Sequence, residues 1–511
     1  MRNRRCSLFL TPVWLGFIAL AGCRPARKPA GTVTMVIESS PTNLDPRIGT
    51  DGQSEHIDAL IFDALVRRDE HFNIQPWLAQ SWETPDPLTV VFHLRSGVHF
   101  HDGRPLSSKD VQWTIMSILN GKVPTVKSQA YRNVDHIDTP DPLTAVFHLK
   151  KADPGLLPSL SDGAIGIVPA GSGRDFGLHP IGSGPFRFVS QEQDKEVVIE
   201  RNPMTWGTPP AIERVRFAVV PDSITRALEL QKGSADIGVN ALTADQVYAM
   251  RNDARIVVES GPGTILNYIS FNTRDFVLKD ARVRQAIAFA INRPLIVSAL
   301  WRGRARIAES LLPTEHWAWS SNVDAHEYDP TRANALLDAA GFKRGRDGVR
   351  FHLTIKTSTD ETGRTLAVVL QQQLRAIGID LEVRSFEFAT FYADIAKGAF
   401  QMYTLRWIGG NEDPDIFRYA YATASAPPHG ANRGYYSNPE FDALVAEAAV
   451  TPSQSGRAAI YAKMQQIVAK ELPAINLWYL DTVIVHNRRL RNVHLSSSGT
   501  FDFLREATVD Q

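Results

Sequence analysis

Residues 403–415 combine an aromatic strand end with glycines and carboxylates. The segment reads YTLRWIGGNEDPD, so Trp407 ends a strand-like run, Gly409-Gly410 follows, and Glu412-Asp413 comes next. A strand end with a bare backbone and a large ring can pair with an extended ligand and stack on it. A core tryptophan before a solvated acidic loop would give the same pattern. Taken alone, these residues leave both interpretations open.

Histidines offer a second kind of chemistry. His99 and His101 share one face of a strand-like segment, Asp102 follows them, and His93 and His148 lie on two similar strands. Neutral imidazoles with a carboxylate would suit Zn²⁺ or Ni²⁺. However, His-x-His arises often by chance, and Asp102 with the next glycine is an equally good turn signal. We therefore expect no metal site and no other cofactor.

Catalytic motifs are missing from the chain. It contains no G-x-S-x-G, H-E-x-x-H, Walker or G-x-G-x-x-G pattern. The glycine-rich segment 182–185 ends in Pro185, which removes an N–H where a phosphate cradle needs one, so we interpret it as a turn. Lys+Arg and Asp+Glu both number 55, which argues against electrostatic nucleic-acid binding. The missing motifs count against a hydrolase, and the balanced charge counts against a nucleic-acid binder.

The amino terminus has the pattern of an export signal. A basic start with Arg2, Arg4 and Arg5 precedes a mostly apolar run, which is too short to span a bilayer comfortably. LAGC, ending at Cys23, resembles a bacterial lipobox, in which the cysteine is lipidated and becomes the first mature residue. The alternative is an ordinary signal peptide with an incidental cysteine. We expect a signal at 1–22, a tether at 23–31 and no thiol in the mature domain.

Strand and helix patterns alternate through the remaining chain. An alternating strand is predicted at 32–37, followed by a helix that carries Ile57, Leu60, Ile61 and Leu65. Further helices are expected at 107–120, 280–290, 294–300, 329–341, 362–377, 438 onward and 457–472. Further strands are expected at 195–200, 214–220, 264–271, 351–357, 379–385, 401–405 and 482–486. This alternation predicts α/β lobes and not a sandwich or a bundle.

One repeat stands out. Residues 84–95 read TPDPLTVVFHLR, and residues 139–150 read TPDPLTAVFHLK. Each copy joins a Pro-Asp-Pro turn to a strand of β-branched and aromatic residues. Because a solenoid needs at least three repeats, two copies predict two similar hairpins in one sheet.

Together these segments resemble the bacterial extracellular solute-binding proteins of family 5, the peptide/nickel ABC-transporter family. The resemblance is carried, in the family's order, by NLDP (43–46), LAQSWE (78–83), FHLRSGVHFHDG (92–103), IGSGPF (181–186), RNP (201–203), DARVRQAI (280–287), AAGF (339–342) and IGI (377–379). It covers nearly everything after Cys23, and the lipoprotein signal agrees with it.

The resemblance implies a two-lobed periplasmic-binding-protein fold with a ligand cleft at the hinge and an extra subdomain. Lobe I would comprise 32–66, 181–263 and 480–511, the additional subdomain 67–180, and lobe II 264–479. The chain would cross between the lobes near 263–268 and return near 477–481.

Ligand residues transfer less directly. In peptide-binding members the cleft includes a loop that corresponds here to Thr50, Asp51 and Gly52. It also includes a segment that matches 406–410, with Arg406, Trp407, Gly409 and Gly410. The tryptophan is present, but the aspartate that fixes the ligand ammonium is replaced by Gly410.

A buried ammonium without a counter-charge is costly, so a neighbour must substitute or the ligand has no free amino terminus there. The candidate substitutes are Glu412, Asp413 and Asp51. Arg364 resembles the cation that dipeptide-binding members direct at the ligand carboxylate, and the N–H groups of a helix start would assist it. A plain surface arginine is the alternative.

The function implied by the resemblance is that of the substrate-binding component of an ABC importer for short peptides. Its partners would be the ligand and the permease and ATPase subunits. We expect a monomer on the periplasmic side, held at the membrane only by its lipid. A nickel chelate, a sugar or an amino-acid conjugate is the first alternative ligand, and an exported hydrolase is the alternative of another class.

Overall fold

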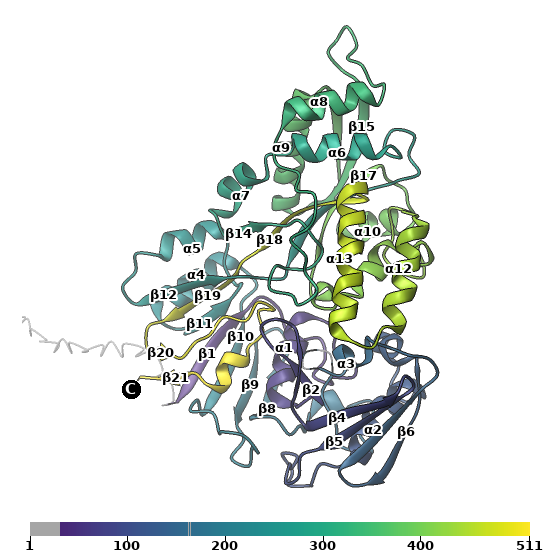
Figure 1. Ribbon diagram of the computed structural model, residues 1–511. Coiled ribbons are helices and arrows are strands. Elements are labelled where there is room, and N and C mark those ends of the chain that lie inside the picture. Colours follow the sequence, from purple (N-terminus) through teal and green to yellow (C-terminus); the bar gives the residue numbers. More distant parts are fainter. Residues whose placement is uncertain (1–30, 162, 164, 511) are drawn as a thin grey trace, which may run out of the picture.

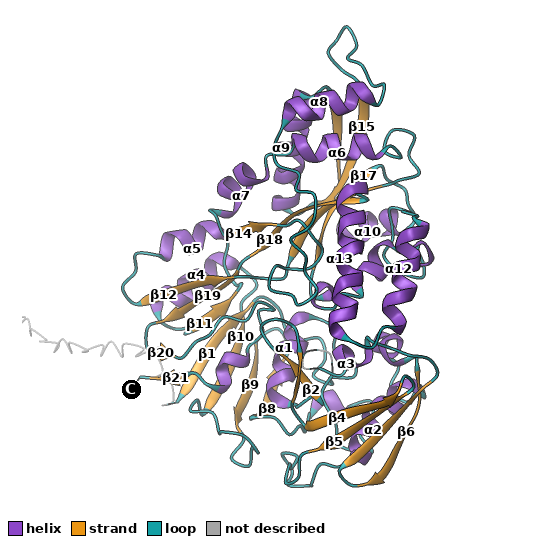
Figure 2. Ribbon diagram, in the orientation of Figure 1, coloured by secondary structure: helices purple, strands orange, loops and turns teal. Residues whose placement is uncertain are grey.

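The computed structural model describes residues 31–161, 163 and 165–510 (Figure 1). The expected signal at 1–22 and Cys23 lie outside these residues, as does the tether up to residue 30. Two large mixed sheets and a smaller antiparallel sheet, each with its own helices, build the described chain (Figure 2). No described helix combines the length and the apolar character that crossing a membrane requires.

Lobe I is built on a seven-stranded sheet of order β12-β19-β11-β1-β10-β9-β8. Its central strand β1 reads TVTMVI and is buried along its whole length, because helices cover both faces of the sheet. Val33, Met35 and Ile37 pack towards α1, whereas Val36 packs towards α4 and α5. The strands are β1 (Thr32–Ile37), β8 (Phe186–Glu192), β9 (Glu196–Arg201), β10 (Arg214–Val219), β11 (Ile237–Val239), β12 (Ile256–Gly261) and β19 (Thr482–Asn487). The helices are α1 (Gly52–Ile61), α4 (Ser223–Lys232) and α5 (Ala244–Met250).

Lobe II is built on a six-stranded sheet of order β14-β18-β13-β17-β15-β16. The strands are β13 (Leu266–Phe271), β14 (Ala305–Ile307), β15 (Phe351–Ser358), β16 (Ile379–Phe386), β17 (Met402–Trp407) and β18 (Ala474–Leu480). The helices are α6 (Ala281–Ala290), α7 (Arg293–Trp301), α8 (Pro330–Ala339), α9 (Glu361–Ala376), α10 (Phe388–Ala396), α11 (Ile416–Tyr421), α12 (Pro439–Val450) and α13 (Gln454–Glu471). The apolar stripe of α9, Leu366, Leu370 and Leu374, packs on the sheet as its helical spacing predicts.

Two short connections join the lobes. β12 ends at Gly261 and β13 begins at Leu266, while β18 ends at Leu480 and β19 begins at Thr482. A side chain at Gly263 would collide with the carbonyl oxygen of Leu480, so the two connections run in close contact. The expected lobe boundary at 479/480 therefore falls inside β18, which extends through Leu480 in the sheet of lobe II.

The repeat forms the subdomain sheet, of order β4-β5-β7-β6. Each copy supplies a hairpin, β4 (Ala79–Asp86) with β5 (Thr89–Leu94) and β6 (Val134–Asp141) with β7 (Thr144–Leu149), which confirms the predicted pair. The two hairpins are related by an approximate two-fold: the Leu94 N–H donates to the Leu143 carbonyl at 2.7 Å, and the Leu149 N–H donates to the Leu88 carbonyl at 2.8 Å. Helices α2 (Ser108–Leu119) and α3 (Leu156–Ser159) belong to the same unit.

Short elements complete the chain. The hairpin β2 (Val66–Arg68) with β3 (Ile74–Pro76) reaches from the subdomain towards lobe II, and β20 (Leu490–Arg491) pairs with β21 (Thr508–Val509) near the carboxyl terminus. The 3₁₀ turns are η1 (Val126–Tyr131), η2 (Phe176–Leu178), η3 (Gly410–Glu412), η4 (Thr423–Ser425) and η5 (Asp502–Arg505).

Candidate functional site

Two parallel strands of lobe II end at the same edge of the sheet. β15 and β17 pair in parallel, so the carboxyl ends of both strands lie side by side. β15 leads through Asp360 into α9, whose first turn carries Arg364, and β17 ends with Arg406 and Trp407. The fold therefore gathers three of the predicted ligand residues at one edge.

Asp360 shows how close Arg406 lies to the start of α9. The Asp360 carboxylate caps the helix by accepting the Gly363 N–H at 2.9 Å, and the Ser358 hydroxyl also donates to it. Burial raises the pKa of this carboxyl, but these hydrogen bonds outweigh burial, and the Arg406 guanidinium adds to them. The net result is a pKa below the ordinary value.

Arg364 is exposed in the first turn of α9. In the part of the chain that the structure describes, its guanidinium has no hydrogen-bond or ion-pair partner. The Gly363 N–H at this helix start is already bound to Asp360, so the partial positive charge of the helix is what remains to favour a ligand carboxylate. The guanidinium and the helix start can thus act together on an anionic ligand group.

Trp407 forms one wall of an aromatic pocket in lobe II. The pocket is lined by Tyr268, Ser270, Tyr403, Trp407, Ala420, Tyr421, Ala431, Asn432, Gly434, Tyr436, Pro473 and Ala474. The Trp407 ring stacks on Tyr268, with centroids 5.7 Å apart and planes at 16°, and the Arg433 guanidinium lies 5.9 Å from the Trp407 centroid. Because Trp407 is only half-buried, part of its ring remains available for contact with a ligand.

The loop after β17 connects lobe II to the β2–β3 hairpin. Gly409, at φ +78°, takes the left-handed turn that leads into η3. Glu412 Oε2 then lies 2.7 Å from Arg68 Nη1 of β2, and the Thr264 hydroxyl donates to Glu412 Oε1 at 3.3 Å. Glu412 is buried, and its ion pair with Arg68 balances its negative charge within the protein.

Further contacts extend this junction between the hairpin and lobe II. The ring of Phe72 stacks on His316 at 5.3 Å, and the Trp317 N–H donates to the His71 carbonyl at 3.2 Å. His316 Nε2 lies 3.3 Å from the carbonyl oxygen of Glu412. Burial lowers the pKa of His316 to about 3, so the ring is neutral at physiological pH.

Asp51 lies between the exposed residues Thr50 and Gly52, and its side chain caps the start of α1. Its carboxylate accepts the backbone N–H of Ser54 at 2.9 Å and the Ser54 hydroxyl at 2.6 Å, and Thr42 donates through its hydroxyl and its N–H. Burial raises the pKa of Asp51, but these hydrogen bonds outweigh it and leave the pKa below the ordinary value. Asp51 was one of the residues predicted to bind a ligand ammonium. In the structure its carboxylate oxygens cap α1 instead.

Asp413 differs from Glu412 in its charge balance. Its Oδ1 accepts the Asp415 N–H at 2.9 Å, and no described residue forms an ion pair with it. Burial, together with the nearby Asp415 carboxylate, raises the pKa of Asp413 to about 6. Of the three carboxylates that the sequence offered, Asp413 is the one that a ligand cation would stabilise most.

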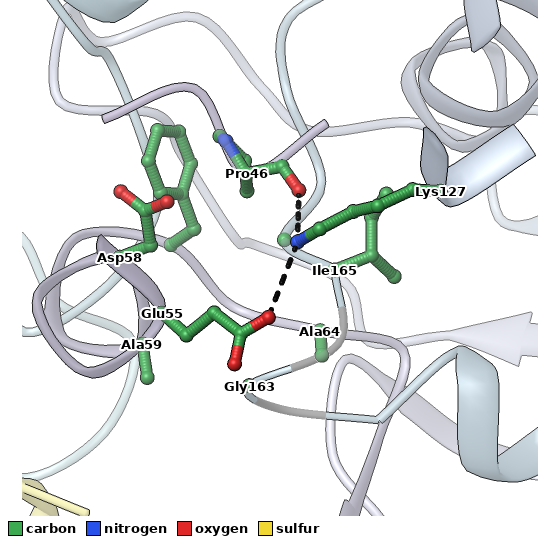
Figure 3. A pocket seen from close by; sticks show the side chains of 10 residues that line it. Pro46, Glu55, Asp58, Ala59, Ala64, Lys127, Gly163 and Ile165 are labelled. Atoms are coloured by element: carbon green, nitrogen blue, oxygen red, sulfur yellow. Dashed lines mark hydrogen bonds and ion pairs between the residues drawn. The ribbon is translucent and has the colours of Figure 1, made fainter. Parts of the chain in front are cut away.

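Another acidic group, which the sequence did not single out, lies on one face of α1 (Figure 3). Glu55, Asp58 and Lys127 line a pocket, with Lys127 Nζ 3.8 Å from Glu55 Oε1 and 2.9 Å from the Pro46 carbonyl oxygen. Burial raises the pKa of Glu55 to about 7 and that of Asp58 well above its usual range. Both Asp58 oxygens are buried without a hydrogen-bond partner among the described residues.

A sequence signal for this pocket did exist. Glu55 and Asp58 lie three residues apart in a segment whose apolar stripe was evident, so they share one face of that helix. The charges of Glu412 and Arg68 act on Glu55, which places this face of α1 beside the junction of the lobes.

Two of the histidines considered for metal binding, His99 and His101, have structural roles. His101 Nδ1 accepts the Gly182 N–H at 3.2 Å, and its Nε2 lies 3.1 Å from the Gly184 carbonyl oxygen. His99 Nδ1 contacts the carbonyl oxygen of Gly97 at 3.0 Å. These contacts use both nitrogens of His101 to fix the turn at 182–185.

Comparisons with known proteins agree with this architecture. The family profile described as "Bacterial extracellular solute-binding proteins, family 5 Middle" matches residues 73–427. The chain is 26% identical over 493 residues to the "Dipeptide-binding protein" of Escherichia coli, covering 90% of this chain and 91% of that protein.

Solved structures give the same result. One is the periplasmic binding protein DppA from Helicobacter pylori in complex with the peptide STSA, with a TM-score of 0.76, 26% identity, and coverage of 94% of this chain and 98% of that one. Another is NikZ from Campylobacter jejuni in complex with Ni(L-His), with a TM-score of 0.78, 24% identity, and coverage of 94% and 100%. The α/β two-lobed periplasmic-binding-protein fold is confirmed.

Proposed function

This chain belongs to the bacterial extracellular solute-binding proteins of family 5, and from that membership we propose that it binds short peptides between its lobes as the receptor of an ABC importer. The observation that carries the proposal is the shared edge of β15 and β17. There, Trp407 offers a stacking surface, and Arg364 offers a cation at a helix start. An extended ligand needs these two features at neighbouring positions.

The ligand carboxylate is assigned to Arg364, with the start of α9 and Arg406 adding positive charge. The ligand backbone would lie along the strand ends near Gly409 and Gly410, which as glycines have no side chain of their own. Trp407 would cover one flank of the peptide. The first peptide residues would then point towards the loop that carries Asp413.

For the ligand ammonium we propose Asp413 as the counter-charge that replaces the aspartate missing at Gly410. Three facts support this choice: Glu412 is paired with Arg68, Asp51 caps α1, and Asp413 has no ion-pair partner among the described residues. Burial and the Asp415 carboxylate raise its pKa more than the charges of Arg457 and Arg68 lower it, so a ligand cation would favour its ionised form. Glu55 is the second candidate, because burial also raises its pKa.

Import would proceed through hinge closure. The two connections at 262–265 and 481 are short, so the lobes can rotate about them and enclose the ligand. The closed form would present both lobes to a permease that works with its ATPase subunits. We further propose that the protein is a monomer on the periplasmic side, exported by the signal at 1–22 and held to the membrane by a lipid on Cys23.

Calorimetry with a panel of dipeptides and tripeptides tests the peptide assignment. Free peptides should bind, N-acetylated peptides should bind at least tenfold more weakly, and Asp413→Asn should abolish that difference. Glu55→Gln, run in parallel, decides between the two carboxylates. If neither variant changes the affinity for free peptides, and acetylated peptides bind as tightly as free ones, the ammonium site is absent. A nickel chelate, a sugar or an amino-acid conjugate then becomes the better assignment, and native mass spectrometry of protein from its own periplasm would identify it.

The hydrolase alternative has a direct test as well. Peptides incubated with the protein should be recovered intact, because the sequence contains no G-x-S-x-G or H-E-x-x-H motif. Cleavage products that scale with protein concentration would overturn the receptor assignment.

A further inference from the structure

The outer face of the subdomain sheet carries two histidines and an aspartate whose donor atoms converge. His136 and Asp138 lie on β6, and His148 lies directly opposite His136 on β7. One donor atom of each residue lies within 4.8 Å of the other two, and the two rings stack with centroids 4.3 Å apart at 15°. From this geometry we propose that the cluster binds a divalent transition-metal ion of the kind that prefers imidazole: Zn²⁺, Ni²⁺ or Cu²⁺.

Hydrogen bonding orients one of the imidazoles for this task. His136 Nδ1 lies 2.8 Å from Asp135 Oδ2, so the ring donates its Nδ1–H to that carboxylate. The Nε2 lone pair of His136 is then free for a metal and faces Asp138 Oδ2 at 4.0 Å. A carboxylate that holds the second nitrogen of a metal-binding histidine is the usual outer partner in such sites.

The second imidazole completes the donor set. His148 Nε2 lies 3.2 Å from the same Asp138 oxygen. His136 Nε2, His148 Nε2 and Asp138 Oδ2 therefore supply two nitrogens and one oxygen, and water would fill the open positions. Metal–ligand bonds of about 2.0–2.2 Å require the side chains to draw slightly together. His136 and Asp138 are exposed and His148 is only half-buried, so little packing resists that movement.

The repeat provides a matched comparison inside the same chain. In the first hairpin, Ser81 lies opposite His93, in the same register as His136 opposite His148. Glu83 takes the place of Asp138, and His93 Nε2 lies 3.2 Å from its carboxylate. The first hairpin therefore has only one imidazole in this arrangement, because Ser81 occupies the position of His136. One donor nitrogen with one carboxylate is a weak site for these metals, so the proposal concerns the second hairpin alone.

The location separates this cluster from the proposed peptide site. β6 is an edge strand of the subdomain sheet, and Figure 1 shows it at the far side of the subdomain from α9 and β17. No residue of the proposed peptide site contributes a donor. The metal proposal therefore goes beyond the peptide proposal and stands or falls independently of it.

Zinc titration of the tag-free protein at about pH 7.5 tests the proposal, because metal binding displaces protons from its ligands and weakens in acid. We expect one Zn²⁺ per chain by calorimetry and by metal analysis after dialysis, with a melting temperature that rises with zinc concentration. Cu²⁺ should bind more tightly than Zn²⁺, in the Irving–Williams order, and Mg²⁺ should not compete.

Variants assign the ion to the cluster. His136→Ser should lower the zinc association constant at least tenfold and remove the zinc-dependent rise in melting temperature. Asp135→Asn should lower the zinc association constant by about 10- to 100-fold, because the carboxylate that holds His136 Nδ1 is lost. His93→Ser, in the first hairpin, should leave the zinc association constant unchanged.

A gain of function provides a second line of evidence. Ser81→His restores the missing imidazole in the first hairpin, and a second zinc per chain in that variant would support the cross-strand geometry. The proposal is overturned if the protein binds no zinc. It is also overturned if zinc binds His136→Ser as tightly as the unmodified protein, because the ion then lies elsewhere.

Discussion

Arg68 and Glu412 form an ion pair between the β2–β3 hairpin and lobe II, with Nη1 and Oε2 2.7 Å apart and side chains 21% and 8% exposed. The loop that carries Glu412 lies in lobe II, whereas Arg68 reaches it from the other side of the hinge. Away from the two covalent connections, this pair therefore helps to hold the lobes in the arrangement seen here. Loss of either member would leave a largely buried charge without its partner.

We expect Glu412→Gln to favour the open arrangement of the lobes. The variant should lower the free energy of unfolding by about 1–3 kcal/mol, less than for a fully buried pair, because Arg68 retains some contact with water. Its radius of gyration in solution scattering should increase. Glu382→Gln is the control, since Glu382 pairs with Arg384 on an exposed surface, where such pairs contribute about 0–1 kcal/mol. Equal melting temperatures and radii for the two variants would refute the role of the pair.

Trp407→Ala should weaken ligand binding by about 10- to 100-fold, whatever the charge of the ligand, because the ring supplies contact area. Trp407→Phe should recover part of the loss. Trp82→Ala, in the subdomain sheet, serves as the control and should change stability without changing affinity. Calorimetry checks all three variants, and unaltered affinity in Trp407→Ala would place the ligand elsewhere.

Arg364→Ala should weaken the binding of peptides with a free carboxyl terminus by about 10- to 100-fold. It should hardly change the binding of amidated peptides. The physical reason is that the guanidinium and the start of α9 act on a negative charge. Arg375→Ala is a matched control, because Arg375 is an exposed arginine in the last turn of the same helix. A similar effect of both substitutions would argue for long-range electrostatics instead of a specific contact.

Glu55 should make stability depend on pH. Burial raises its pKa from 4.5 to about 7, so the folded protein takes up a proton that the unfolded chain has released. This contribution to stability is fully present below about pH 4.5 and is lost as the pH rises through about 7. Its size is about 1–2 kcal/mol once partial exposure of the side chain is allowed for.

Denaturant titrations between about pH 4 and 8 measure this effect. Glu55→Gln should flatten the pH profile, whereas Glu70→Gln, at a highly exposed side chain, should leave it unchanged. An identical pH profile for Glu55→Gln and the unmodified protein would mean that Glu55 is ionised without penalty in the folded state.

Cys23→Ser should release the protein from the membrane fraction or block its processing, because the lipid on Cys23 is the only anchor that we expect. Membrane fractionation and the intact mass of the mature protein provide the measurement. A variant that stays with the membrane and shows no loss of acyl mass would contradict lipid anchoring.

Much of the local structure could be predicted from the sequence, because it depends on neighbours along the chain. The alternation of 32–37 predicted β1, and the apolar spacing of 280–290 and 329–341 predicted α6 and α8. The repeat predicted two hairpins, since each copy contains its own turn and strand. β18 was not predicted, because AINLWYL is a short continuous apolar run without the alternation that identifies a strand.

The roles of individual charged residues depended on the tertiary structure. Asp51, Glu412 and Asp413 look alike in the sequence, yet one caps a helix, one pairs with Arg68, and one has no ion-pair partner among the described residues. Those differences arise from groups far away in the chain, because burial and distant charges set the state of a carboxylate. His136 and His148 likewise meet only through strand register. Residue patterns along the chain were enough to predict many of the elements, the repeat and the family, whereas which side chains share one site depended on contacts between segments far apart in the chain.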